Sequence, residues 1–188
     1  LIRIESLGEG GAGKVYRAID LRDGQEVAVK EVSLAAFGPD RRKRIVETVR
    51  NEYAVAVTLP ELPGVAKVRG LLSDPDGTLF IVQDLVKGTT LGRFCAGSPE
   101  PGKLLPLMLD VAEALGALHA SGIVHRDLKP DNVMVRRGRN RDEAVLVDFG
   151  IALLDGQSDT LKRYGTAGYM APEQARGGDV DGSADIYA

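Results

Sequence analysis

The chain has 188 residues, of which 44% are hydrophobic and 27% are charged, and its formal net charge is −3. That length suffices for one domain with a substantial core or for two small lobes. The nearly balanced charge gives no general attraction to nucleic acid or to a membrane surface. No apolar run is as long as a membrane span, and no signal peptide is visible. The single cysteine, Cys95, excludes an intramolecular disulfide and fits a reducing compartment; we expect it to be a small apolar filler. We expect a cytoplasmic location, with a parent protein anchored in a membrane and this segment on its cytosolic side as the alternative.

Residues 1–4 alternate apolar and polar side chains, as a half-buried strand does. The glycine-rich segment from Gly8 to Val15 follows, and three interpretations compete for it. A Walker A loop would need Ser or Thr where Val15 stands. A Rossmann turn should open a helix, whereas residues 15–19 continue as a strand. A glycine-rich hairpin over a nucleotide needs strand, turn and strand with Val after the last glycine, and this sequence has both features.

Asp23-Gly24 is a hairpin turn signal between two strand patterns. The second pattern runs through Val27-Ala28-Val29-Lys30, in which alternation points Lys30 and Val29 to opposite faces. Taken alone, Lys30 would be interpreted as an exposed strand lysine.

A helix is predicted from about residue 40 to residue 59. Its apolar stripe, spaced by three and four, contains Ile45, Val49, Glu52, Ala56 and Leu59. A carboxylate on such a stripe is costly unless it is paired, and Lys30 is the natural partner of Glu52. A solvated Glu52 at the stripe's edge is the alternative, and the rival acid Glu47 lies off the stripe. The basic run 41–44 predicts a solvated helix start, with a nucleic-acid patch as the alternative.

Two further strands are predicted at residues 65–72 and 78–84, separated by a turn composition at residues 74–77. A second helix is predicted at residues 104–120, with Pro106 tolerated in its first turn. Its repeat consists of Leu104, Leu107, Met108, Val111, Leu115 and Leu118.

Gly122 is suited to cap the C-terminal end of this helix. The basic run 136–141, which Gly138 and Asn140 interrupt, predicts a solvated hairpin turn. The chain begins inside a strand pattern and stops at Ala188 without a cap, so we expect a piece of a longer protein.

The stretch His125-Arg126-Asp127-Leu128-Lys129-Pro130-Asp131-Asn132 is followed, sixteen residues after Asn132, by Asp148-Phe149-Gly150. Apolar runs that predict strands surround both segments, at residues 123–124, 133–135 and 144–147. Loops at strand ends display polar groups on a rigid frame. Asp127, Asn132 and Asp148 fit phosphoryl transfer from ATP. One carboxylate can accept the proton of the attacking hydroxyl, while a carboxylate and an amide oxygen hold Mg²⁺.

In this order and at this spacing, the two segments resemble the catalytic loop H-R-D-x-x-x-x-N and the D-F-G of protein kinases. Residues 165–173 resemble the end of a kinase activation segment, G-T-x-x-Y-x-A-P-E. Lys129 and Thr166 follow the pattern of Ser/Thr kinases. The short sequence motifs most resemble those of eukaryotic-type (Hanks-type) kinases of bacteria. The resemblance covers essentially the whole chain. It implies an α+β, two-lobed kinase fold: an N-lobe of a small antiparallel sheet and a helix at 1–85, and an incomplete, mainly helical C-lobe at 86–188.

This resemblance implies a Ser/Thr protein kinase that uses ATP with Mg²⁺ or Mn²⁺. Asp127 would be the catalytic base, Lys129 would stabilise charge on the transferring phosphoryl group, and Lys30 with Glu52 would position ATP. Asn132 and Asp148 would hold the metal. The nucleotide contacts implied, with Gln83 as gatekeeper and Asp84 to Val86 as the hinge, are Leu7, Gly8, Gly10, Gly13, Val15, Ala28, Lys30, Gln83, Asp84, Val86 and Met134.

Arg126 beside Asp127 is the arrangement in which a phosphate on the activation segment supplies a counter-charge. Thr160 is the first candidate acceptor and Ser158 the second, with unmodified loop hydroxyls as the alternative. In the family, an acid at the position of Asp185 hydrogen-bonds the catalytic-loop backbone.

The expected partners are ATP, protein substrates with Ser or Thr, and a second copy bound through the N-lobe. Nucleic acid is not expected. Since the remaining large-lobe helices are missing, the apolar underside of that lobe should be open to water. Two rival classes remain. A pseudokinase usually lacks the Lys, the Asn or the D-F-G Asp, and a small-molecule kinase generally lacks a segment like residues 165–173.

Overall fold

The computed structural model describes residues 1–10, 13–32, 34, 38–75, 77–148 and 166–188. The chain divides into two compact units. Unit 1 comprises Leu1–Leu59 and Lys67–Leu85, and unit 2 comprises Pro60–Ala66 and Val86–Ala188.

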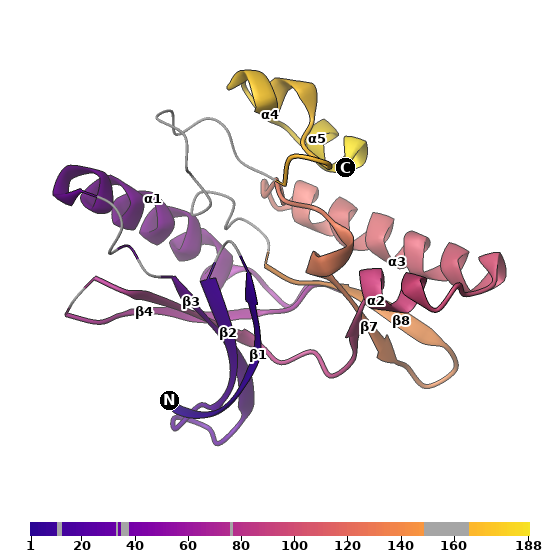
Figure 1. Ribbon diagram of the computed structural model, residues 1–188, viewed down its shortest axis with the longest axis horizontal. Coiled ribbons are helices and arrows are strands. Elements are labelled where there is room, and N and C mark those ends of the chain that lie inside the picture. The colour runs from indigo at the N-terminus through magenta and orange to yellow at the C-terminus, as the bar shows by residue number, and fades with distance from the viewer. Residues whose placement is uncertain (11–12, 33, 35–37, 76, 149–165) are drawn as a thin grey trace. The chain divides into compact units, whose positions relative to one another are not determined.

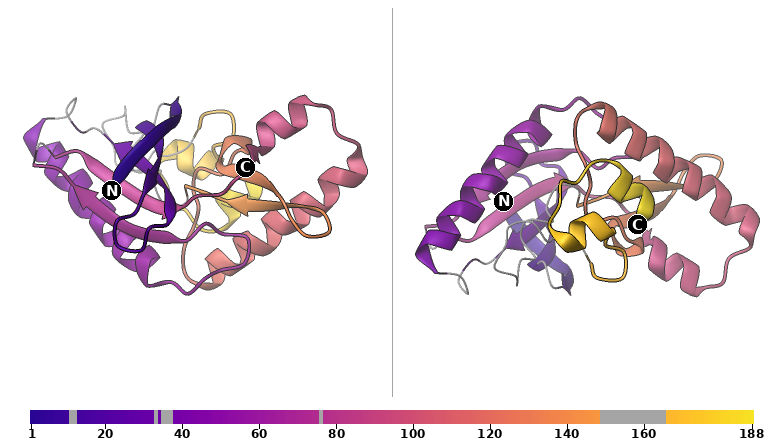
Figure 2. Two further views of the ribbon diagram at one scale, coloured as in Figure 1. Left: turned by 90° about the horizontal axis from the view of Figure 1, so that it is seen from below. Right: turned by 90° about the horizontal axis from the view of Figure 1, so that it is seen from above.

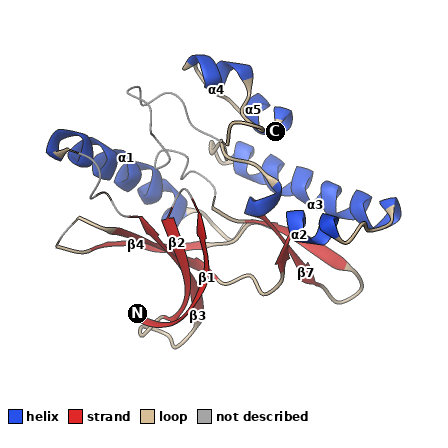
Figure 3. Cartoon of the chain, in the orientation of Figure 1, coloured by secondary structure: helices blue, strands red, loops and turns tan. Residues whose placement is uncertain are grey.

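The described part of unit 1 contains an antiparallel sheet of five strands in the order β1-β2-β3-β5-β4 (Figures 1 and 3). Its strands are β1 (Ile2–Gly10), β2 (Gly13–Ile19), β3 (Glu26–Val32), β4 (Val68–Ser73) and β5 (Leu79–Asp84). The alternating apolar residues of β3 and its neighbours form one buried cluster of Ala18, Val27, Val29 and Val82, with Phe80 packed against it. The first strand is an exposed edge and not half-buried, since Ile2 and Ile4 are 54% and 44% exposed.

The helix α1 (Pro39–Thr58) packs on β4 and confirms the helix expected from about residue 40. Proline is favoured in a first helical turn because its missing N–H would have no intrahelical partner there. Ile45, Val49 and Tyr53 are buried on one side of the helix. Tyr53 thus belongs to the buried side of the helix, although the predicted apolar stripe does not include it.

The boundary of β4 differs from the prediction, because the strand begins at Val68 and not at residue 65. Val65 instead forms an isolated parallel bridge with Leu146. The Ala66 N–H donates to the Leu146 carbonyl at 2.9 Å, and the Leu146 N–H donates to the Gly64 carbonyl at 2.7 Å. These hydrogen bonds place residues 64–66 in unit 2. The apolar run at residues 65–72, predicted as one strand, is therefore divided between the two units.

Unit 2 combines helices with a small antiparallel sheet in the order β6-β7-β8. Its elements are β6 (Thr89–Thr90), α2 (Leu91–Ala96), α3 (Pro101–Ala120), the 3₁₀ turn η1 (Pro130–Asn132), β7 (Val133–Arg137), β8 (Asp142–Leu146), α4 (Pro172–Arg176) and α5 (Ser183–Tyr187). Helix α3, pink in Figure 2, packs on β8 of the orange hairpin. The α+β architecture predicted from the sequence is confirmed.

Several local predictions in unit 2 are wrong. Helix α3 begins at Pro101, so Pro106 lies inside the helix and not in its first turn, and Met108 is 50% exposed. Residues 123–124 form no strand in the described structure, because the Ile123 N–H donates to the Leu118 carbonyl and closes the end of α3. Cys95 is exposed on α2 and is therefore not a core filler.

Among the described residues of unit 2, two groups of apolar side chains are exposed to water. They are formed by Leu105, Met108 and Leu109 on α3 and by Ile186 and Tyr187 on α5. Over the part of the chain that the structure describes, no helix is long and apolar enough to cross a membrane.

Candidate active site

The β7–β8 hairpin brings the ends of two distant segments together. Asn132 immediately precedes β7, and Asp148 follows the end of β8 by two residues. Val133 pairs with Leu146, and the Val147 N–H donates to the Asn132 carbonyl at 3.0 Å. In an antiparallel pair the start of one strand lies beside the end of the next. Asn132 and Asp148 are therefore neighbours in unit 2.

The backbone around these residues is unusual, because Arg126 and Asp148 have φ angles of 66° and 58°. Non-glycine residues in this region carry a cost of about 1–3 kcal/mol and are concentrated at functional sites. At Arg126 two side chains hold the strained conformation. The Asp185 carboxylate accepts its N–H at 2.7 Å, and the Gln174 amide donates to its carbonyl at 2.8 Å.

Asp185 is 2% exposed and makes two further contacts. Its Oδ2 accepts the His125 N–H at 2.8 Å and lies 2.8 Å from Nε2 of His119. The prediction that Asp185 hydrogen-bonds the catalytic-loop backbone is therefore confirmed.

Asp127 is the centre of a polar cluster. Its Oδ1 accepts the N–H and the hydroxyl of Thr166 at 3.0 and 2.9 Å. Its Oδ2 lies 2.9 Å from Nζ of Lys129 and accepts the Asn132 amide at 3.0 Å. Lys129 also donates to the Thr166 hydroxyl at 2.7 Å. The structure thus brings together three residues of the catalytic loop, Asp127, Lys129 and Asn132, and one of the activation-segment pattern, Thr166.

The pKa of the Asp127 carboxyl lies below its ordinary value. Burial opposes ionisation, but the hydrogen bond and the charge of Lys129 outweigh it, with further hydrogen bonds from Thr166 and Asn132. Asp127 is therefore ionised at neutral pH. An ionised carboxylate can orient a hydroxyl and accept its proton.

His125 is fully buried and connects the loop to the residue before Asp148, since its Nε2 lies 3.2 Å from the Val147 carbonyl. Burial lowers the pKa of this imidazole, against the smaller opposing effect of Asp185. The ring is thus neutral, and its Nε2–H donates to the Val147 carbonyl.

The oxygen donors in unit 2 fit a divalent cation. The Asn132 amide nitrogen donates to the backbone carbonyl and to Oδ2 of Asp127, which leaves the amide oxygen to bind a cation. Among the described residues no three His, Cys, Asp or Glu side chains form a complete metal site. Mg²⁺ is commonly held by one or two protein carboxylates together with substrate phosphates, so this limited set suits it.

In unit 1, strand register gathers the residues proposed for the nucleotide. Gly8 pairs with Val15, Val15 with Lys30, and Ala28 with Gln83. Directly opposed side chains share one face of a sheet. Lys30 is only 7% exposed, so the interpretation of an exposed strand lysine is wrong.

The glycine-rich segment is a β-hairpin. Gly10 and Gly13 form the last strand pair before residues 11–12, which lie outside the described residues. Because a strand and not a helix follows on the far side of residues 11–12, a Rossmann-type loop, which would open a helix, is excluded. Leu7 is exposed on β1 next to this hairpin.

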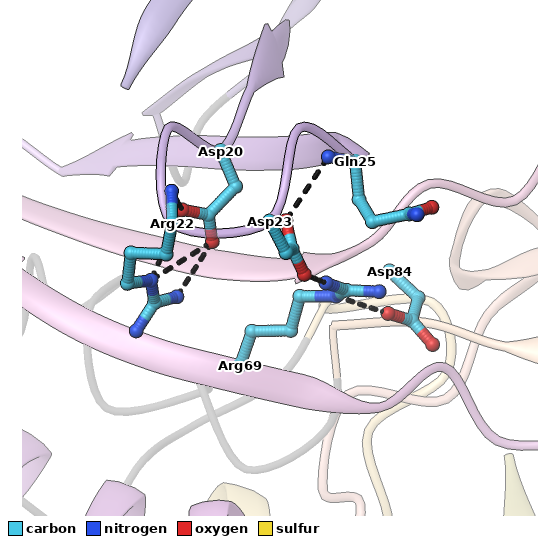
Figure 4. Close-up of polar contacts among 6 residues, drawn as sticks. All are labelled: Asp20, Arg22, Asp23, Gln25, Arg69 and Asp84. Carbon is cyan, nitrogen blue, oxygen red and sulfur yellow. Dashed lines mark hydrogen bonds and ion pairs between the residues drawn. The ribbon is translucent and has the colours of Figure 1, made fainter.

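The end of β5, where the hinge is predicted, is tied to other strands by an arginine. Arg69 on β4 donates from Nε to the Asp84 carboxylate at 2.5 Å and from Nη1 to the Asp23 carboxylate at 2.8 Å (Figure 4). The Arg69 side chain therefore links the β2–β3 turn, β4 and Asp84, the first residue of the predicted hinge. Val86 and Met134 belong to unit 2, where both pack against a buried cluster of Ala66, Val145 and Val147.

Some predicted residues cannot be placed. Phe149, Gly150, Ser158 and Thr160 lie outside the described residues, as does the side chain of Glu52, whose backbone lies in α1. Conversely, sequence reasoning missed His119 and Gln174. Nothing local marks either residue, since their partners lie 66 and 48 residues away along the chain.

One unit thus holds a buried strand lysine, and the other holds a loop in which Asp127, Lys129 and Asn132 are in contact. The family model described as the protein kinase domain matches residues 1–188, and the chain belongs to this family.

Relatives and solved structures agree with this assignment. The chain is 36% identical over 197 residues to serine/threonine-protein kinase pkn3 of Myxococcus xanthus, covering 99% of this chain and 35% of that protein. It is 40% identical over 193 residues to the DNA damage-responsive serine/threonine-protein kinase RqkA of Deinococcus radiodurans, covering 97% of this chain and 27% of that protein. The crystal structure of the Mycobacterium tuberculosis PknI kinase domain is similar with a TM-score of 0.75 and 32% identity, covering 99% of this chain and 69% of that one. The chain spans 35% or less of the length of the first three curated relatives.

Proposed function

We propose that the protein containing this chain is a Ser/Thr protein kinase that transfers the γ-phosphoryl group of ATP to protein hydroxyls. The observation that carries the proposal is the cluster in which Asp127 contacts Lys129, Thr166 and Asn132. It joins a carboxylate, a cation and an amide in one place, which is the set that phosphoryl transfer uses.

Asp127 orients the substrate hydroxyl and accepts its proton. Its lowered pKa keeps the carboxylate ionised, so it is ready to act as an acceptor at neutral pH. Lys129 already lies 2.9 Å from this carboxylate, and its charge offsets the negative charge of the transferring phosphoryl group.

Asn132 and Asp148 would hold a divalent cation, Mg²⁺ or Mn²⁺. Such a cation would supply positive charge against the negative charge of the phosphates. The proposed role of Lys30, with Glu52 as its partner, is to position the α- and β-phosphates of ATP.

The residues proposed for nucleotide contact lie in both units. Unit 1 contributes Leu7, Gly8, Gly10, Gly13, Val15, Ala28, Lys30, Gln83 and Asp84, and unit 2 contributes Val86 and Met134. A nucleotide-binding scaffold without turnover is not favoured, because Lys30, Asn132 and Asp148 are all present. Protein substrates and an activation segment phosphorylated at Thr160 or Ser158 belong to the same proposal.

The test incubates the full-length protein with Mg²⁺ and ATP, beside its Lys30→Met variant, and maps phosphate by mass spectrometry. Phosphate at Thr160 or Ser158 in the parent and not in the variant is expected. Lys103→Met, an exposed substitution on α3, is the matched control and should behave as the parent does. Absence of phosphate from the parent and from a generic protein substrate would contradict the proposal.

A further inference from the structure

Gln174 forms a buried bridge between two segments of unit 2. It lies in α4, directly after Ala171-Pro172-Glu173, and is 3% exposed. Its Oε1 accepts the Ala171 N–H at 3.0 Å, and its Nε2 donates to the Arg126 carbonyl at 2.8 Å. A buried amide with both ends bonded to backbone has one preferred orientation, because turning it would leave polar groups unsatisfied.

The bridge ends on a loop residue whose backbone is strained. Arg126 has a φ of 66°, its N–H is held by Asp185, and its carbonyl is held by Gln174. The carbonyl belongs to the planar peptide group that joins Arg126 to Asp127. Fixing this carbonyl therefore fixes the rotation of that plane and, with it, the direction in which Asp127 leaves the backbone.

We propose that Gln174 is a positioning residue for phosphoryl transfer, which orients Asp127 by holding the Arg126 carbonyl. This inference rests on the proposed function. With this role, helix α4 contributes to the placement of Asp127, because the chain from Thr166 to α4 then holds Asp127 through two residues. Thr166 contacts the carboxylate directly, and Gln174 holds the preceding peptide group.

The decisive variant is Gln174→Glu in the full-length protein. It keeps the oxygen that accepts the Ala171 N–H but sets a carboxylate against the Arg126 carbonyl. We expect kcat near pH 8 to fall about ten- to a hundredfold, since a buried bond is lost and like partial charges meet. The KM for ATP should stay within about twofold, because the lost interaction does not touch the nucleotide.

A pH series distinguishes positioning from a general loss of structure. Burial raises the pKa of a carboxyl group, so a glutamic acid at position 174 should become protonated as the pH falls from about 8 to about 6. Its O–H can then donate to the Arg126 carbonyl, and the kcat of the variant relative to the parent should rise. Gln174→Met, which has similar length and adds no charge, should lower kcat without this recovery.

The matched control is Gln25→Glu, the same chemical change at an exposed turn in unit 1. It should leave kcat and its pH dependence unchanged. Amide hydrogen exchange of residues 125–128, measured without nucleotide, should be faster in Gln174→Glu than in this control.

Each outcome decides a separate question. An inactive parent contradicts the proposed function, and the exchange measurement then still supports or overturns the bridge. An active parent whose Gln174→Glu and Gln174→Met variants keep its kcat overturns the positioning role. If Gln174→Glu does not fold, Gln174→Met decides by its kcat alone.

Discussion

The Asp185 carboxylate accepts the N–H of Arg126 at 2.7 Å, and so holds a non-glycine residue with a φ of 66°. The acid lies 59 residues away along the chain, on the short helix α5. A strained loop persists only where its surroundings over-determine it. Because the same carboxylate also accepts the His125 N–H, one side chain fixes two successive peptide groups ahead of Asp127.

Asp185→Asn should therefore weaken both folding and turnover. The amide can accept only on one of its two terminal atoms, so one buried backbone N–H loses its partner, at a cost of about 1–3 kcal/mol in unfolding free energy. Urea unfolding measures this change, and kcat should fall with it. The exposed Asp179→Asn is the control and should stay within about 0.5 kcal/mol. Equal stability of the two variants would contradict the role of Asp185.

Asp127→Asn should lower the kcat of the full-length protein by about 10²–10⁴ or more, in line with the loss of a general base. The amide keeps the size of the side chain but cannot accept the proton. Asp131→Asn, an exposed change in the same loop, should retain most of the activity. Near-normal turnover in Asp127→Asn would exclude the proposed role.

The pKa of Asp127 adds a pH criterion. Since it is lowered in the folded protein, the ionised carboxylate adds stability above the unfolded pKa, and this stability is lost as the pH falls through the folded value. The lowered pKa also keeps the carboxylate of Asp127 ionised near neutral pH. Its protonation should therefore cause no decline in kcat in that pH range. A decline there that Asp127→Asn abolishes would contradict this assignment.

Sequence patterns revealed those parts of the molecule whose signals are local. The period of α1 and the Asp23-Gly24 turn between β2 and β3 were predicted because neighbouring residues determine them. Likewise the catalytic-loop motif located Asp127 and Asn132, which the structure shows in contact.

Other features depend on partners that are remote in sequence. Val65 pairs with Leu146, which no apolar run can reveal, so the predicted start of β4 lies three residues before the observed one. The bridge from Gln174 to Arg126 depends on where α4 packs, and the amide side chain alone carries no sign of it. Tertiary hydrogen bonds of this kind override local preference without leaving a periodic signal.

Acid stability should depend on a buried carboxylate in unit 1. Hydrogen bonds from the side chain and the backbone of Arg22 lower the pKa of Asp20 from 3.8 to about 2 (Figure 4). A lowered pKa adds stability that is present above the unfolded value and is lost as the pH falls through the folded value. The unfolding free energy of the parent should thus fall between pH 3.8 and about 2.

Two substitutions test this relationship. Asp20→Asn should flatten the decline of the unfolding free energy over that pH interval, measured by urea unfolding at several pH values. Arg22→Met removes the largest cause of the shift, so the folded pKa of Asp20 moves back toward its unfolded value and the decline should be smaller than in the parent. A parent curve that coincides with that of Asp20→Asn at every pH would refute the assignment.

Gly88, two residues after Val86, is required by a close backbone approach. A Cβ at this position would overlap the Val135 carbonyl oxygen, on the strand next to β6. Neither backbone atom can move without disturbing the sheet, so Gly88→Ala should destabilise unit 2 by about 1–3 kcal/mol or more. The predicted hinge should shift with it and raise the KM for ATP.

The matched control is Gly116→Ala in the middle of α3, where an added Cβ meets nothing within 4 Å. There the methyl group only restricts the unfolded chain and favours the helix, so stability should rise by about 0.5–1 kcal/mol. Urea unfolding of both variants measures the contrast. The change in unfolding free energy should have opposite signs in the two variants, although the chemical change is the same. A Gly88→Ala variant as stable as the parent would contradict the prediction and show that the backbone near β6 can relax around the added methyl group.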